Sequence, residues 1–366
     1  MSTKMDEATH NSPQVEPPKR MASPGRRRSK KTWIRALSPQ NISAVYVGVA
    51  LLVMFSIWVP STFLTRLTFS STLSTNVVVG LVSLGLVFPL VTGVYDLSIG
   101  FTLGLSSTIV AVLNVNEGMA AWEAVVVAVI VGVLIGCVNG FLIVKLHIDS
   151  FMATLGMGSV LGGLILLIGG ANQIVGLSVG LGNLAAHQWF EISLPVFLLI
   201  VIALVMWYVL EQTPSGRFFQ ATGGGKDAAR LAGIQTDRYI FLSLIVSAVM
   251  GTIAGIVLTA QLQSSSPDYA TQYLLPGFAA AFLGATQLKR GRPNVWGTLI
   301  AVFVLGIGTE GFNLVGVQSW INDVFYGAAL LIAVGLSVFQ RRPKSVTVTP
   351  DGTDGLPSNA AAHVPT

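Results

Sequence analysis

Charged residues are scarce in this chain. Asp, Glu, Lys and Arg together make up 10% of its 366 residues, whereas 52% are hydrophobic and the mean hydropathy is +0.71. A water-soluble chain of this length exposes far more polar surface, so the composition excludes a soluble protein and indicates one that crosses a membrane several times. Cysteine is nearly absent: Cys137 is the only one, which excludes an internal disulfide.

The sequence also lacks the patterns of common catalytic and metal sites. It contains no HExxH and no cluster of Cys and His residues. The string Gly223–Lys226 resembles part of a phosphate-binding loop, but Gln220 stands where the first glycine is required and Asp227 follows the lysine. We therefore expect no enzyme activity, no metal and no cofactor. Any energy for transport must come from an ion gradient or from another polypeptide.

Long stretches with almost no charged residue follow one another along the chain. They cover residues 44–64, 76–94, 98–114, 122–144, 150–170, 193–211, 239–262, 272–287, 295–309 and 320–339. A helix needs about 20 residues to cross the hydrocarbon core of a bilayer, and about 17 is the lower limit. The pattern predicts an all-α bundle of about ten transmembrane helices. The third, eighth and ninth stretches are short, so we expect polar extensions there, or helices that are broken or re-entrant.

The basic residues are unevenly distributed among the connecting segments. With the N-terminus placed in the cytoplasm, all 21 Lys and Arg residues except Arg66 fall in cytoplasmic segments. Because positively charged loops stay inside, we predict that both termini are cytoplasmic. Three parts follow: a disordered basic tail over 1–40, a transmembrane domain over 41–342 and a disordered tail over 343–366. The net charge of +5 suits an anionic membrane surface, so membrane lipid is an expected partner and nucleic acid is not.

Glycines recur every four residues in three of the predicted helices. They are Gly132, Gly136 and Gly140 in the fourth helix, Gly251 and Gly255 in the seventh, and Gly100 and Gly104 in the third. Such stripes let helix backbones approach closely in lipid. We expect them to serve packing within the bundle, with an interface to a second subunit as the alternative.

The longest predicted cytoplasmic loop, 212–238, contains a candidate docking helix. Asp227 could cap a short helix through Ala228 and Ala232, and Gly233 would stop it, since glycine tolerates left-handed backbone geometry. Alanines keep such a helix narrow, and Leu231 gives it one apolar contact for a groove on another protein. An ordinary amphipathic loop helix at the membrane surface fits the composition equally well.

Gly216-Arg217 followed by Ala228–Ile234 is similar to the coupling-loop signature of the ribose-type permeases of ABC importers. Four further strings, in order with this one over residues 45–340, resemble other motifs of that family. They are Thr92–Gly100, similar to Gly-Gly-Ile-Asp-Leu-Ser-Val-Gly; Asn139-Gly140 with Ser150–Met157; Phe278–Gly284 with Trp296–Thr298; and Gly311–Val317. The match is incomplete, since Leu274-Leu275-Pro276 occupies the place of a Glu-Leu-Asp stretch.

The resemblance implies a transport mechanism and a set of partners. Two permease subunits, identical or related, would form a pathway in the bacterial plasma (inner) membrane. A cytoplasmic ATPase would receive the loop helix, and an extracytoplasmic substrate-binding protein would deliver the solute, usually a monosaccharide. The residues expected to couple to the ATPase are Gly216, Arg217, Asp227, Ala228, Ala229, Arg230, Leu231 and Gly233.

Polar and aromatic residues in the predicted helices are candidates for the solute pathway. The set we favour is Asp96, Phe151, Thr154, Gln261 and Asn313. Asp96 could cap the third helix or serve as a gate or ligand, because a charge near the membrane needs a purpose. The alternative function is a stand-alone secondary transporter or channel, and a third is a membrane scaffold. A secondary transporter would need ligands for a coupling ion or a relay of buried acids, and the predicted helices contain few acids.

Overall fold

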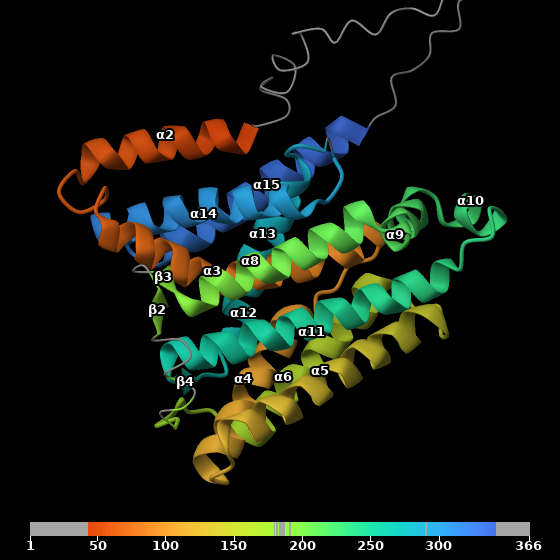
Figure 1. Ribbon diagram of the computed structural model, residues 1–366, viewed down its shortest axis with the longest axis horizontal. Coiled ribbons are helices and arrows are strands. Elements are labelled where there is room, and N and C mark those ends of the chain that lie inside the picture. The colour runs from red at the N-terminus through yellow and green to blue at the C-terminus, as the bar shows by residue number, and fades with distance from the viewer. Residues whose placement is uncertain are drawn as a thin grey trace, which may run out of the picture. The chain divides into compact units, whose positions relative to one another are not determined.

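The computed structural model describes residues 43–178, 180, 182, 187–189, 192–289 and 291–341. The predicted tails over 1–40 and 343–366 lie outside these residues. The helices are α2 (Ser43–Trp58), α3 (Arg66–Thr92), α4 (Ile99–Ala111), α5 (Ala121–Val144), α6 (Ser150–Gly169), α8 (Leu194–Trp207), α9 (Pro214–Gly224), α10 (Lys226–Leu231), α11 (Thr236–Leu262), α12 (Tyr269–Gln272), α13 (Leu274–Ala285), α14 (Val295–Val315) and α15 (Trp320–Arg341). Figure 1 shows the long helices running side by side.

Each predicted hydrophobic stretch corresponds to a helix or a pair of helices. Seven of the described helices, some with a π-helical extension, are long and apolar enough to cross a membrane, and α2 and α15 contribute shorter apolar segments. The third stretch gains length because α4 continues as a π-helical turn over Val112–Asn116. The ninth extends through polar residues to Val315, so α14 is continuous. The eighth is broken at Tyr273 into α12 and α13.

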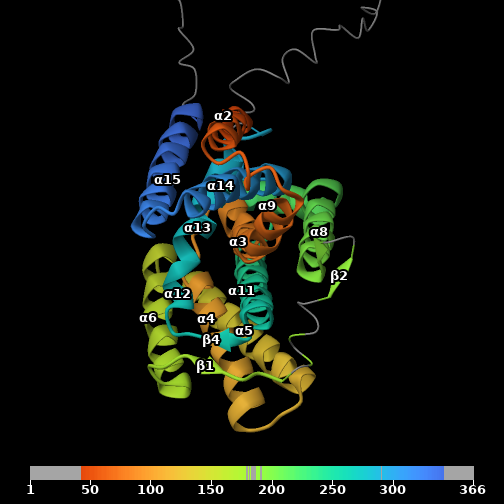
Figure 2. The same ribbon diagram turned by 90° about the vertical axis from the view of Figure 1, so that its left-hand side faces the viewer.

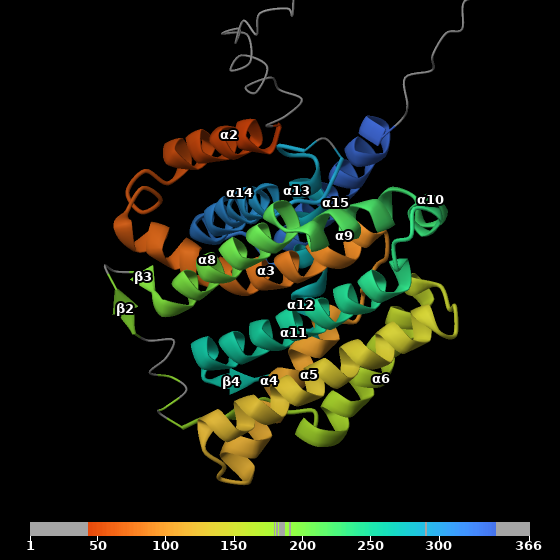
Figure 3. The ribbon, with the colours of Figure 1, turned by 45° about the vertical axis from the view of Figure 1, so that its right-hand side comes forward.

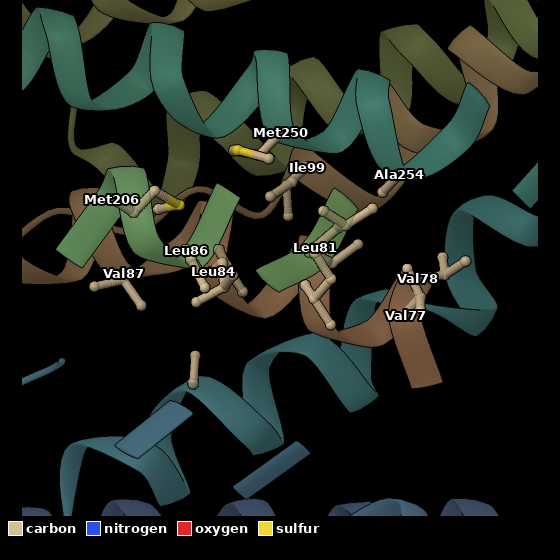
Figure 4. Packing of buried hydrophobic residues seen from close by; sticks show 14 of the residues in the cluster. Val77, Val78, Leu81, Leu84, Leu86, Val87, Ile99, Met206, Met250 and Ala254 are labelled. Atoms are coloured by element: carbon tan, nitrogen blue, oxygen red, sulfur yellow. The ribbon is translucent and has the colours of Figure 1, made fainter. Parts of the chain in front are cut away.

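The core of the bundle is built on α3 and α11. Every residue of α3 from Asn76 to Pro89 is buried, since α8, α9, α11, α13 and α14 surround this helix. Apolar side chains fill the space between these helices, with Leu81 and Leu84 of α3 near Met206 of α8 and Met250 of α11 (Figure 4). Close packing of these side chains holds the helices together, since lipid itself supplies no hydrophobic driving force for their association.

The glycine stripes pack helices of the same chain together. A Cβ atom at Gly136 of α5 would lie 2.6 Å from the Cα of Ile245 in α11, and one at Gly251 of α11 would lie 2.9 Å from the carbonyl oxygen of Ile99 in α4. A Cβ at Gly100 would lie 2.6 Å from the carbonyl oxygen of Ala270 in α12. The packing interpretation is therefore confirmed for these stripes, and a second subunit has no access to them.

One end of the bundle gathers the segments that carry the basic residues. The backbone N–H of Ala44 donates to the Gln287 side chain at 3.2 Å, and Lys289 lies 2.8 Å from Glu211. The backbone N–H of Tyr95 donates to the Ser150 hydroxyl at 3.3 Å. Figures 1 and 3 show α9 and α10 at this same end, on the right. We call it the basic end.

The opposite end of the bundle carries short strands. Strand β1 (Ile174–Val175) pairs antiparallel with β4 (Ser264–Ser265), and β2 (Gln188–Trp189) pairs with β3 (Ile192–Ser193). Hydroxyls of Ser74 in α3 and Ser193 in β3 lie 2.8 Å apart. These pairings satisfy backbone groups in the connections between helices, where no helix can supply partners.

Candidate coupling site

Helices α9 and α10 form a projecting segment at the basic end. Pro214 opens α9, and the hydroxyl of Thr213 caps it by accepting from the Gly216 N–H at 3.3 Å. Gly225 separates the two helices, and its carbonyl accepts from the Ala229 N–H at 2.9 Å. The expected cap at Asp227 is wrong, because Lys226 is already helical and Asp227 lies within the first turn of α10. There the negative charge still favours the positive end of the helix dipole.

Gly233 ends α10 as its residue type predicts. Its φ angle is 82°, in the left-handed region, and its N–H donates to the Arg230 carbonyl at 2.9 Å. The Ile234 N–H then donates to the Ala229 carbonyl at 3.0 Å. These two bonds turn the chain sharply from α10 toward α11.

The surface of α10 presents one large apolar side chain. Leu231 is 91% exposed, whereas Ala229 on the opposite side is 6% exposed. Ala228 and Arg217 are also exposed. Helix α10 therefore exposes Leu231 among small and charged side chains.

Ion pairs hold α10 against the start of α11. A guanidinium nitrogen of Arg230 lies 2.7 Å from a carboxylate oxygen of Asp237, and its Nε donates to the Thr236 hydroxyl at 3.0 Å. Lys226 lies 3.4 Å from the same carboxylate oxygen. These side chains are more than 40% exposed, so the pairs add little stability and serve mainly to orient α10. Our sequence reasoning missed Asp237, whose role depends on the turn at Gly233.

Helix α9 connects α10 to the core. The ring of Phe219 makes edge-to-face contacts with Phe88 of α3 and Tyr239 of α11, each with centroids 5.1 Å apart. A Cβ at Gly223 would collide with the carbonyl oxygen of Val91, at the end of α3. A Cβ at Gly216 would collide with the carbonyl oxygen of Leu210. Helix α9, which α10 follows in the chain, is therefore packed directly against α3 and α11.

Asp96 lies in the connection between α3 and α4 and is completely buried. One carboxylate oxygen accepts from the N–H of Ser98 at 3.0 Å and from its hydroxyl at 2.6 Å, which shapes the turn before α4. The capping interpretation of Asp96 thus has a geometric basis, although Ser98 occupies the cap position itself. Burial raises the pKa of the Asp96 carboxyl, while the hydrogen bonds from Ser98 act in the opposite direction.

The structure does not bring the five predicted pathway residues together. Thr154 is buried, where its hydroxyl accepts from the Leu97 N–H at 3.0 Å and braces the connection that holds Asp96. Gln261 lies at the other end of the bundle and donates to the Ser74 carbonyl at 3.1 Å. Asn313 is exposed and accepts from the Asn322 side chain at 3.0 Å. Phe151, at the start of α6, is half exposed.

An aromatic cluster that the pathway set left out lies near the start of α6. The rings of Tyr95 and Phe282 stack with centroids 6.3 Å apart, and Phe282 stacks on Phe278 at 6.1 Å. Tyr95 is 43% exposed, and its N–H is bonded to Ser150, the residue before Phe151. No local pattern in the sequence indicates this cluster, because Tyr95 and Phe282 come together only through folding.

An apolar cavity of about 550 Å³ lies between α8, α9 and α11. Val205 and Met206 of α8 and Leu242 and Met250 of α11 form much of its wall, and Arg238 lies at its edge. Its walls offer too few hydrogen-bonding groups for a polar solute, since specific sites need such groups at defined positions.

Comparison with known families identifies the kind of membrane protein to which this chain belongs. A family model described as a branched-chain amino acid transport system permease component matches residues 68–334. The chain belongs to this family. The permease is thus the transport subunit of an ABC importer, a multi-pass protein of the bacterial inner membrane and not an enzyme. Importers of this kind work with an ATPase and a substrate-binding protein.

Individual relatives of the permease are sugar importers by name. Ribose import permease protein RbsC of Bacillus subtilis (strain 168) is 34% identical over 291 residues, covering 79% of this chain and 90% of the relative. RbsC of Escherichia coli (strain K12) is 30% identical, covering 85% and 96%. The D-allose transport system permease protein AlsC of the same organism is 28% identical, covering 84% and 94%. No solved structure matches the permease.

Proposed function

We propose that the permease imports a monosaccharide and that α10 is its contact with the ATPase. The observation that carries the proposal is the projecting α10, with Leu231 91% exposed, on a segment packed directly against α3 and α11. The names of the ribose and allose relatives support a sugar as the solute. The neutral hydrogen-bonding groups and aromatic rings of the bundle suit an uncharged polar molecule.

The proposed topology has about ten membrane crossings and cytoplasmic termini. Its support is the clustering of the segments that carry basic residues at one end of the bundle, which includes the free ends of α2 and α15 in Figure 1. Positively charged segments remain on the cytoplasmic side, so the basic end faces the ATPase. We place the transmembrane domain over 41–342 and the tails over 1–40 and 343–366.

In this proposal the coupling residues have different tasks. Leu231 and the exposed face of α10, with Ala228 and Asp227, meet the ATPase. Gly233, Ala229 and Arg230 hold the shape and angle of α10. Gly216 and Arg217 belong to the joint between α8 and α9, where Gly216 allows the close approach and Arg217 is free to meet the partner.

A second permease subunit would complete the solute pathway on the side formed by α6, α13 and α15. Figure 2 shows these helices along one side of the bundle. Unlike the stripes buried within the chain, Gly156 and Gly163 of α6 and Gly327 of α15 have nothing within 4 Å of a Cβ position. Phe151 and Tyr95 are exposed on or beside α6, and would line the pathway near its cytoplasmic end.

The assembly of two subunits can be tested by cross-linking. In a Cys137→Ser background, Gly327→Cys should form a disulfide between two copies in native membranes, and Val201→Cys on α8 serves as the control. Equal cross-linking at both positions, or none at Gly327→Cys, would contradict the proposed interface. Cross-linking only with a different permease would identify a heterodimer.

ATP-driven uptake tests the function and separates it from the alternative of a stand-alone secondary transporter. Membrane vesicles that contain the permease with its ATPase and binding protein should take up labelled ribose or allose only when ATP is supplied. Leu231→Asp should abolish both uptake and co-purification of the ATPase. Leu67→Asp, at an 80% exposed leucine at the opposite end of the bundle, should leave ATPase binding unchanged. Uptake by the purified permease alone, driven by an ion gradient, would overturn the proposal.

A further inference from the structure

Four buried polar side chains from three parts of the chain meet beside the start of α4. Asp96 and Ser98 come from the α3–α4 connection, Asn139 from α5 and Ser247 from α11, and all four are 0% exposed. The amide nitrogen of Asn139 donates to the Ser98 hydroxyl oxygen at 2.8 Å, and that hydroxyl donates to Asp96 at 2.6 Å. We call this group the Asp96 cluster.

Three oxygen atoms of the Asp96 cluster have no hydrogen-bond partner among the described residues. They are Oδ2 of Asp96, Oδ1 of Asn139 and Oγ of Ser247. The described residues contain one other buried side-chain atom of this kind, in Asn322. Because buried polar groups are nearly always paired, three such atoms in one cluster require an explanation in the chemistry of the site.

Burial without a paired cation points to the protonation state of Asp96. An ionised Asp96 would keep its charge in the interior with one oxygen, Oδ2, that no donor among the described residues reaches. A proton on that oxygen removes the charge and turns an unpaired acceptor into a donor. We propose that Asp96 carries a proton on Oδ2 in the folded permease.

The electrostatic surroundings favour the neutral acid. The side chains beside Asp96 are neutral: Ser98 on its own segment and Ser247 from α11. Asn139 from α5 contacts Ser98, and Thr154 from α6 contacts the Leu97 backbone. The charged residues of the neighbouring elements, Lys145, Asp149, Asp237 and Arg238, lie toward the helix ends. A buried carboxylate without a cationic partner is costly, and binding a proton removes that cost.

The proton has a structural consequence at the coupling segment. The Ser98 hydroxyl, which donates to Asp96, accepts from Asn139 of α5, and the same connection begins at Gly93, whose Cβ position would lie 3.6 Å from the Cα of Gly223 in α9. The cluster thus fixes the surface on which α9 rests. Loss of the proton would leave a buried charge at this point and loosen it.

The Asp96→Asn variant tests the proposal through stability against pH. An asparagine side chain keeps the shape, stays neutral at every pH and can supply an N–H in place of the proton. Because the folded pKa of Asp96 is raised, its contribution to stability is full below the unfolded pKa of about 4 and is lost as pH rises through the folded pKa. Asp96→Asn should therefore have a Tm equal to or above wild type at neutral pH, with the difference growing as pH rises.

Asp149→Asn, at the N-cap of α6, is the control for this experiment. Its Tm should not rise relative to wild type as the pH increases above 5, since Asp149 accepts two backbone N–H groups in an exposed position. A lower Tm for Asp96→Asn than for wild type would overturn the proposal. If sodium chloride then stabilised wild type more than choline chloride did, a bound cation would replace the proton. Without that effect, the cluster would hold an ionised acid and water.

Infrared spectroscopy gives a second readout that does not depend on folding stability. The carbonyl stretch of a protonated, buried carboxyl group should be present in the wild-type permease at neutral pH and should be lost in Asp96→Asn. Glu310→Gln is the control, because it removes another carboxyl of the bundle and should leave this band in place. Identical spectra for wild type and Asp96→Asn would show that Asp96 is ionised.

Discussion

Asp237 and Asp96 lie at the same end of the bundle, yet their carboxylates differ in exposure to water and in the charge of their partners. Asp237 is 44% exposed and has two cationic partners, Arg230 and Lys226. Asp96 is fully buried and is surrounded by hydroxyl and amide groups. Where water is near, charges orient an exposed segment at small energetic gain. Where water is excluded, neutral hydrogen bonds hold the backbone, because an unpaired charge there would be costly.

The largest effect is expected from a variant that separates the two regions at the contact between α9 and α3. In Gly223→Val the new side chain would collide with the Val91 carbonyl, so α9 must move off α3. We expect a loss of about 1–3 kcal/mol in stability and near-complete loss of ATP-driven uptake. Thermal unfolding and vesicle uptake measure the two effects. The control is Gly224→Ala, with nothing within 4 Å of its Cβ, and equal behaviour of both variants would contradict the contact.

Ser98→Ala tests the buried region alone. It removes the hydroxyl that donates to Asp96 and accepts from Asn139, and so leaves buried polar atoms without partners. The expected destabilisation is about 1–3 kcal/mol, measured by thermal unfolding in detergent. Ser159→Ala, on an exposed hydroxyl bonded only within α6, should change little. A neutral result for Ser98→Ala would mean that the cluster does not hold the connection.

Arg230→Glu tests the exposed region. The glutamate would repel Asp237 and turn α10 out of position, while stability changes by less than about 1 kcal/mol because the pair is exposed. Co-purification of the ATPase should fall clearly. Adding Asp237→Arg recreates the pair in reverse and should restore part of the binding. Failure of this rescue would indicate that Arg230 itself contacts the ATPase.

The smallest effect is expected from Lys226→Ala. Asp237 keeps its shorter contact with Arg230, and a surface ion pair contributes about 0–1 kcal/mol. Uptake and the melting temperature should both stay close to wild type. A loss of uptake as large as that of Arg230→Glu would show that Lys226 belongs to the docking surface.

Much of the fold could be predicted from the sequence, because hydrophobic length and glycine spacing are local properties. The helices, the packing of Gly136 and Gly251, and the left-handed turn at Gly233 all follow from patterns within a few residues. The break at Tyr273 was one of several possibilities for a short stretch. The cap at Asp227 was placed wrongly, since the residue type fits a cap and the exact start of a short helix depends on its neighbours.

The predictions for the solute pathway had less success for a physical reason. Thr154 and Gln261 are polar residues in apolar helices, and a polar side chain there can either face a solute or satisfy a neighbouring helix. The structure gives both of them partners within the chain. Tyr95 and Phe282, which stack on each other, lie far apart in the sequence, so no local pattern could have paired them.

The break between α12 and α13 has a mechanical consequence. Helix α12 packs on α4, while α13 packs on α3, α14 and α15, and Tyr273 joins the two. A rotation about this residue costs few helical hydrogen bonds, whereas the same rotation within a continuous helix would break an entire turn of them. Tyr273 is therefore the point in this part of the chain where the angle between α12 and α13 can change without bending a long helix.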